Sequence, residues 1–201
     1  LLRDPVAVLA ERGVHLPTGL PLPVVHEVVR VAFLLWVDGK ILPIDQFHID
    51  PFDEGLLFGR GLWESTRTIG GVPWLWSEHL DRLRRTAALL DVEVAPERLP
   101  DGRQVSEFVR TLTAQDVVVR LNATAGRPGK APGLVWMSAA LPPVPRASVR
   151  LQSRQTPVLK EQPYQAWKTF QYAERLRTGR QAVQAGFDTA LMLDLNGNVL
   201  E

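Results

Sequence analysis

The chain has 201 residues and a formal net charge of +1, a balance that excludes the strongly basic surface of a nucleic-acid-binding domain. Cysteine is absent, which excludes disulfides, thiolate metal sites and cysteine nucleophiles and agrees with a cytoplasmic location. The longest apolar run, residues 31–37, is far shorter than the roughly 20 residues of a membrane-spanning helix, and the four histidines lack metal-ligand spacing.

Four prolines interrupt residues 1–32, so we expect this segment to be a peripheral N-terminal extension with short helical stretches near residues 6–12 and 24–31. A β-hairpin is predicted next. Two apolar runs, residues 33–37 and 40–44, flank Asp38-Gly39, and this pair readily takes the positive φ angles that a two-residue hairpin turn needs.

A second hairpin is predicted from residues 62–69, a Gly70-Gly71 turn and residues 72–76. Ser77 is expected to cap the following helix, because acidic residues occupy the first turn and apolar residues recur at helical spacing. The pattern then indicates a helix and two strands, at residues 105–112, 117–123 and 134–139. Together, residues 33–140 would form a small α+β domain.

A proline-rich stretch, residues 141–147, is the best candidate for a linker between domains. The pattern after it predicts a strand, a helix, a second strand and a return strand beyond an Asn-Gly turn, at residues 149–153, 173–185, 189–194 and 198–201. Residues 148–201 are too few for a comfortable core of their own. We therefore expect them to begin a larger domain that is truncated or that borrows core from elsewhere.

Lys168 is the most distinctive of the four lysines, because it lies among aromatic residues in a stretch of low charge. Burial there would disfavour the charged ammonium, which a Schiff-base lysine requires. The alternative is a lysine whose aliphatic stem packs on the aromatic rings while its ammonium reaches water.

The sequence around this lysine resembles the signature stretch of class-IV (fold-type IV) pyridoxal-phosphate enzymes. Lys168-Thr-Phe-Gln-Tyr172 is followed by a helix, by Gly186-Phe-Asp-Thr-Ala-Leu-Met-Leu-Asp194 and by Asn196-Gly-Asn-Val-Leu-Glu201. That family includes branched-chain and D-amino-acid aminotransferases and aminodeoxychorismate lyase. The resemblance implies a two-domain α+β fold whose larger, cofactor-binding domain begins at residue 148.

Three motifs in the first half also resemble this family: Trp36-Val-Asp-Gly-Lys40, Asp53-Glu-Gly-Leu-Leu-Phe-Gly-Arg-Gly-Leu-Trp-Glu-Ser-Thr-Arg67 and His79-Leu-Asp-Arg-Leu83. The family continues beyond the position that matches Glu201.

The resemblance also implies roles for single residues. Lys168 would form the Schiff base with pyridoxal 5'-phosphate, Glu201 would contact the pyridine nitrogen, and Arg82 would contact the phosphate. Tyr172 would either line the cofactor pocket or simply pack against its neighbours. Taken alone, Arg82 and Glu201 would be interpreted as ordinary surface charges.

Substrate-binding residues are expected on the strand at residues 62–69 and on the strand that contains Arg120. Trp63 and Arg67 share one face with Ser65 by two-residue alternation, and Trp63 stands where the family usually has Phe or Tyr. Arg120 is a charge within an apolar strand, so it either faces the substrate or is an outward-facing or paired residue.

These features predict a pyridoxal-phosphate-dependent aminotransferase that moves an amino group between an amino acid, branched-chain or D, and a 2-oxo acid through Lys168. A homodimer is implied by the resemblance, without nucleic-acid or membrane partners. One alternative is aminodeoxychorismate lyase of 4-aminobenzoate and folate synthesis, although Glu64 and Arg67 favour an aminotransferase. Another is an inactive truncated homologue.

Overall fold

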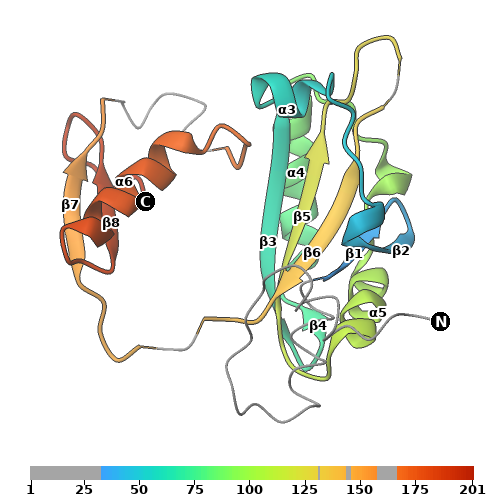
Figure 1. Ribbon diagram of the computed structural model, residues 1–201, viewed down its shortest axis with the longest axis horizontal. Coiled ribbons are helices and arrows are strands. Elements are labelled where there is room, and N and C mark those ends of the chain that lie inside the picture. Colours follow the sequence, from blue (N-terminus) through green and yellow to red (C-terminus); the bar gives the residue numbers. More distant parts are fainter. Residues whose placement is uncertain (1–32, 131, 144–145, 158–166) are drawn as a thin grey trace. The chain divides into compact units, whose positions relative to one another are not determined.

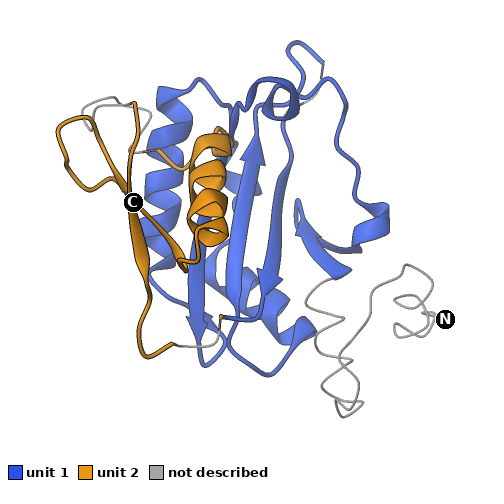
Figure 2. Cartoon of the chain, turned by 60° about the vertical axis from the view of Figure 1, so that its left-hand side comes forward, with its two compact units in different colours: residues 1–142 blue, residues 143–201 orange. Residues whose placement is uncertain are grey.

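The computed structural model describes residues 33–130, 132–143, 146–157 and 167–201, which fall into two compact units (Figure 2). Unit 1 comprises residues 1–142 and unit 2 residues 143–201. The predicted N-terminal extension and its short helices lie outside the described residues, as do parts of the predicted linker. No helix among the described residues is long and apolar enough to cross a bilayer.

Unit 1 contains a six-stranded sheet with the order β2-β1-β6-β5-β3-β4, and its neighbouring strands run antiparallel (Figure 1). The strands are β1 (Leu34–Val37), β2 (Lys40–Pro43), β3 (Gly61–Ile69), β4 (Val72–Pro73), β5 (Val118–Thr124) and β6 (Val135–Ala140). The helices are α3 (Glu54–Phe58), α4 (Trp76–Leu89) and α5 (Gly102–Leu112), with 3-10 turns at Ile44–Gln46 and Pro96–Arg98.

Helices α4 and α5 bury one face of the sheet. Helix α4 packs against β3 and α5 against β4, and the core beneath them includes Leu62, Leu121 and Met137 from three neighbouring strands. Leu121 is the register partner of Met137, and Leu62 pairs with Ala123, two residues beyond Leu121, so all three core residues share one face of the pleat. The alternate residues of β3 and β5 therefore belong to the other face.

Both predicted hairpins are confirmed. Asp38 and Gly39 have φ angles of 45° and 89°, as the two-residue turn between β1 and β2 requires. Strand β3 is the longest strand, and it turns at Gly70-Gly71 into the short strand β4.

The predicted Ser77 cap is wrong, because α4 begins at Trp76. The indole Nε1 of the buried Trp76 donates a hydrogen bond to the carbonyl oxygen of Pro100 at 2.8 Å, which anchors the first turn. The hydroxyl of Ser77 donates instead to the carboxylate of Glu78. Helix α5 also starts earlier than predicted. Asp101 is its N-cap and forms a capping box with Gln104, so the helix begins at Gly102.

Helix α3 was not predicted, and the buried Asp53 holds it in place. The Asp53 carboxylate accepts hydrogen bonds from the Gly55 amide and from the Thr124 hydroxyl, both at 2.7 Å. The short helix exposes an apolar patch, which we call the α3 patch, formed by Phe52, Leu56, Leu57 and Phe58.

Unit 2 consists of β7 (Leu151–Gln155), α6 (Ala173–Gln184) and β8 (Thr189–Leu193), with β7 and β8 paired in parallel. Gly186, with a φ angle of 86°, follows the end of α6 as predicted. The predicted return of the chain is present, but it is no regular strand, since it pairs with β8 only through an isolated bridge between Leu193 and Val199. The Leu200 amide donates to the Met192 carbonyl oxygen, and the Met192 amide donates to the Glu201 carbonyl oxygen. Only two hydrophobic residues of this unit, Ala182 and Met192, are fully buried among the described ones.

Candidate active site

Glu64 is the best-buried acidic group of unit 1 that pairs with cations. The alternation of β3 turns it towards α4, and its side chain is only 1% exposed. Two residues of α4 that are one helical turn apart contact the Glu64 carboxylate. The Arg82 Nε and Nη2 donate to its two carboxylate oxygens at 2.6 and 2.5 Å, and the His79 Nδ1 lies 2.9 Å from the second oxygen.

This pairing fixes both the orientation and the charge of Arg82. The hydrogen bond to Glu64 raises the pKa of Arg82 above its ordinary value, so its guanidinium keeps its charge. The Arg82 side chain is nevertheless 43% exposed, and its Nη1 has no partner in the part of the chain that the structure describes. One edge of the guanidinium is thus anchored and another can receive an anion.

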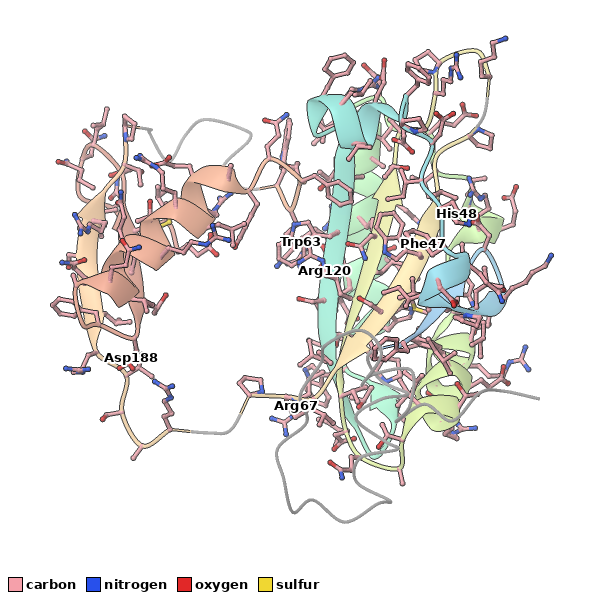
Figure 3. All side chains as sticks on the ribbon, in the orientation of Figure 1. Phe47, His48, Trp63, Arg67, Arg120 and Asp188 are labelled. Atoms are coloured by element: carbon pink, nitrogen blue, oxygen red, sulfur yellow. The ribbon has the colours of Figure 1, made fainter. Side chains whose placement is uncertain are left out.

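Trp63 and Arg120 lie together on the face of the sheet opposite α4 and α5 (Figure 3). The Arg120 guanidinium carbon lies 4.1 Å from the centre of the Trp63 ring, and its Nε donates to the Asn122 side chain at 3.0 Å. Arg67 lies on the same face of β3, two residues beyond Ser65, which is the register partner of Arg120. The three predicted substrate-binding residues therefore share a single surface.

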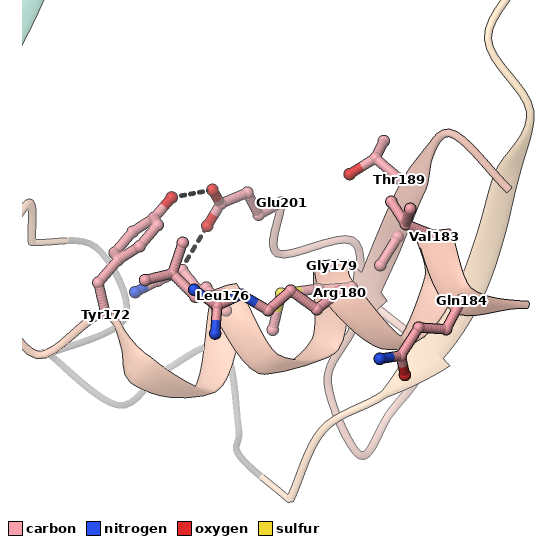
Figure 4. A pocket seen from close by; sticks show the side chains of 11 residues that line it. Tyr172, Leu176, Gly179, Arg180, Val183, Gln184, Thr189 and Glu201 are labelled. Atoms are coloured by element: carbon pink, nitrogen blue, oxygen red, sulfur yellow. Dashed lines mark hydrogen bonds and ion pairs between the residues drawn. The ribbon is translucent and has the colours of Figure 1, made fainter. Parts of the chain in front are cut away.

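Glu201 is the centre of the candidate site in unit 2 (Figure 4). Its carboxylate accepts a hydrogen bond from the Tyr172 hydroxyl and forms an ion pair with the Arg175 Nε at 2.5 Å. Tyr172 and Arg175 are one helical turn apart at the start of α6, so both side chains reach the same point.

A cavity of about 590 Å³ opens beside this carboxylate. The walls combine Tyr172, Arg175 and Glu201 with apolar surface from Leu176, Gly179 and Val183. A cavity of this size with a few polar groups suits a small ligand. Lys168 is half-buried and lies four residues before Tyr172, but it does not line this cavity.

The structure thus brings some predicted residues together and leaves others apart. Tyr172 contacts Glu201, and Trp63 contacts Arg120, whereas Arg82 belongs to unit 1 and Lys168 to unit 2. Glu64 and His79 were not predicted as partners of Arg82, and Arg175 was not predicted as a site residue. The only available signal was spacing, because His79 and Arg82, like Tyr172 and Arg175, are three positions apart.

A family model described as amino-transferase class IV matches residues 61–201. The chain belongs to this family.

Among the curated relatives of this chain is a Methanocaldococcus jannaschii protein assigned to the branched-chain-amino-acid aminotransferases. The two are 30% identical over 182 residues, which cover 83% of this chain and 62% of the relative. The aminodeoxychorismate lyase of Bacillus subtilis is 28% identical over 130 residues, 64% of this chain and 44% of the relative. The chain therefore spans less than two thirds of the length of these relatives.

The solved structures show the same fold. A hypothetical aminotransferase from Mycobacterium tuberculosis in its apo form matches with a TM-score of 0.73 at 21% identity, over 83% of this chain and 63% of that one. The pyridoxal-phosphate-bound form of that protein matches as well. The predicted family and fold class are therefore confirmed.

Residues of this chain have chemistry that suits pyridoxal phosphate. The anchored guanidinium of Arg82 suits a phosphate, the carboxylate of Glu201 suits a ring nitrogen, and Lys168 supplies a primary amine in the matched region.

Proposed function

We propose that this protein is a pyridoxal-phosphate-dependent aminotransferase that moves an amino group between an amino acid and a 2-oxo acid. The observation that carries the proposal is the Glu201 carboxylate, which Tyr172 and Arg175 hold at the wall of a cavity within the region matched by the family model. When bound, the cofactor would withdraw electrons from the substrate carbon that loses its proton.

The chain's own residues would then bind the cofactor and move that proton. Lys168 would attach the cofactor covalently, and its amine, once released by the substrate, would carry the proton to and from the substrate carbon. Arg82 would hold the phosphate with the part of its guanidinium that Glu64 does not engage. Glu201 would face the ring nitrogen, and Tyr172 would keep its carboxylate in place.

The face of the unit 1 sheet opposite α4 and α5 would bind the substrate. Trp63 offers an apolar wall, and the Arg120 guanidinium beside it offers a partner for a carboxylate, while Arg67 adds a second positive charge on the same face. An apolar wall beside a cation fits branched-chain or D-amino acids and 2-oxo acids.

The test is to locate the lysine that carries the cofactor. We expect the purified protein to develop a visible absorbance band with pyridoxal phosphate, and borohydride reduction followed by peptide mass spectrometry to place the cofactor on Lys168. Lys168→Ala should lose the band and lower aminotransferase activity on the order of 10³-fold. The matched control is Lys130→Ala, which changes an exposed loop lysine and should leave both unchanged. Attachment to a different lysine would contradict the proposal.

Aminodeoxychorismate lyase remains the second candidate, because the Bacillus subtilis enzyme of that name matches 64% of this chain. Pyruvate release from aminodeoxychorismate would support the lyase, and amino transfer from leucine or D-alanine to 2-oxoglutarate would support the aminotransferase. A protein that binds the cofactor but catalyses neither reaction would fit the inactive homologue.

We also propose that two copies of the chain associate through the α3 patch. Its four large apolar side chains are exposed within a span of seven residues, which is unusual for a surface that contacts only water. Sedimentation equilibrium measures this association directly. A cytoplasmic location remains a prediction from the sequence.

A further inference from the structure

The backbone of Glu201 is fixed independently of its side chain. The Met192 amide donates to the Glu201 carbonyl oxygen at 2.7 Å, and the Leu200 amide donates to the Met192 carbonyl oxygen at 2.9 Å. These bonds place the last residues alongside β8. The direction and the electrostatic surroundings of the Glu201 carboxylate are therefore decided by the groups on α6 that contact it.

Both oxygens of that carboxylate are engaged. The Tyr172 hydroxyl donates to Oε1, and the Arg175 Nε lies 2.5 Å from Oε2. Each carboxylate oxygen can accept more than one hydrogen bond, so a ligand in the cavity can still reach the carboxylate. Such a ligand would share its acceptor with the Arg175 guanidinium.

Arg175 differs from an ordinary surface arginine. Its side chain is only 15% exposed, and its guanidinium carbon lies 5.1 Å from the centre of the Tyr172 ring. Arg177, two residues along the same helix, is 65% exposed and pairs with Glu174. Arg175 is thus held against Glu201, while Arg177 provides a natural control on the solvent side of α6.

A carboxylate keeps a proton on a neighbouring base because its negative charge favours the protonated form. A cation paired with the same carboxylate opposes this effect, because its positive charge lies close to the protonated base and repels it. The Glu201 side chain is 48% exposed, so solvent weakens this repulsion between the two positive charges without removing it.

We propose that Arg175 weakens the hold of Glu201 on the proton of the cofactor's ring nitrogen and so limits how strongly the ring withdraws electrons. The inference rests on the proposed function, in which Glu201 faces that nitrogen. Arg175 is in this sense a positioning and tuning residue, because it acts through Glu201 and not on the substrate.

The experiment is to titrate the ring nitrogen of ¹⁵N-labelled pyridoxal phosphate by NMR in the loaded protein. Arg175→Gln removes the charge and keeps an N–H donor, so the nitrogen should stay protonated to a pH about one unit higher than in the unsubstituted protein. Arg175→Lys keeps the charge and should titrate close to the unsubstituted protein. Arg177→Gln should titrate identically to it.

The direction in which the titration midpoint shifts distinguishes an electrostatic effect of Arg175 from a purely structural one. If Arg175 only held Glu201 in place, Arg175→Gln would leave the midpoint unchanged or lower it, and either result would overturn the inference. Arg175→Met is a second neutral variant, in case the glutamine variant folds poorly. If neither neutral variant holds the cofactor while Arg175→Lys does, Arg175 is a structural anchor and the inference is wrong. Failure of the unsubstituted protein to carry the cofactor on Lys168 would instead overturn the proposed function, and with it the inference.

Discussion

Two arginine–glutamate pairs, Arg82 with Glu64 and Arg175 with Glu201, have the same chemical groups in different surroundings. In unit 1 the Glu64 carboxylate is sealed between β3 and α4, and a histidine shares it. In unit 2 the Glu201 carboxylate stands at a cavity, half open to water. The sealed pair must stay intact because the buried Glu64 charge would be stranded without Arg82, whereas the open pair can exchange a partner for a ligand.

The sealed pair should show the largest effect on stability. Arg82→Met leaves the Glu64 carboxylate buried with only His79 beside it, and we expect the free energy of unfolding of unit 1 to fall by about 3 kcal/mol. Urea denaturation measures this change. Arg84→Met, which breaks an exposed pair with Asp81 on the same helix, is the control and should stay within about 0.5 kcal/mol. Equal losses in the two variants would refute the distinction between sealed and open pairs.

The equivalent substitution in the open pair should have a smaller effect. Arg175→Met is expected to lower the free energy of unfolding of unit 2 by at most about 1 kcal/mol, since water replaces the lost partner of Glu201. Thermal unfolding followed by circular dichroism provides the measurement. A loss as large as that of Arg82→Met would mean that Arg175 is a structural residue, as the NMR titration also tests.

The smallest effect is expected at Asp188, which joins the starts of β7 and β8. The backbone N–H of Arg150 donates to its carboxylate at 2.8 Å and lowers the pKa of Asp188, and Arg146 adds to this. Because the pKa is lower in the folded state, the stabilisation is present at neutral pH and is lost as the pH falls below about 4. Asp188→Asn should therefore lower the thermal midpoint slightly at pH 7 and by less at pH 3. An equal difference at both pH values would contradict this assignment.

Much of unit 1 could be predicted from the sequence, because its signals are local. The Asp38-Gly39 turn and the two-residue alternation of β3 indicate the hairpins, and that alternation separates Trp63 from Glu64. The start of α4 was misjudged, since a tertiary hydrogen bond from Trp76 determines it and no capping side chain does.

The contacts of the candidate site were harder to predict. The family resemblance indicates Arg82 and Glu201, but their immediate partners come from other elements of the fold. Glu64 reaches Arg82 across 18 positions in sequence, and Glu201 reaches Arg175 only after the chain has turned back along β8. No periodicity within one element contains that information.

The turn after β8 has a consequence for evolution and engineering. The Asp194 carboxylate accepts hydrogen bonds from the backbone amides of Asn196 and Asn198, and this closed loop sets which residue lies opposite Met192. One residue inserted there would turn the Glu201 side chain to the opposite side of the strand, since side chains alternate along it. The chemistry at this end of the chain thus depends on the number of residues in a loop as much as on the identity of any one of them.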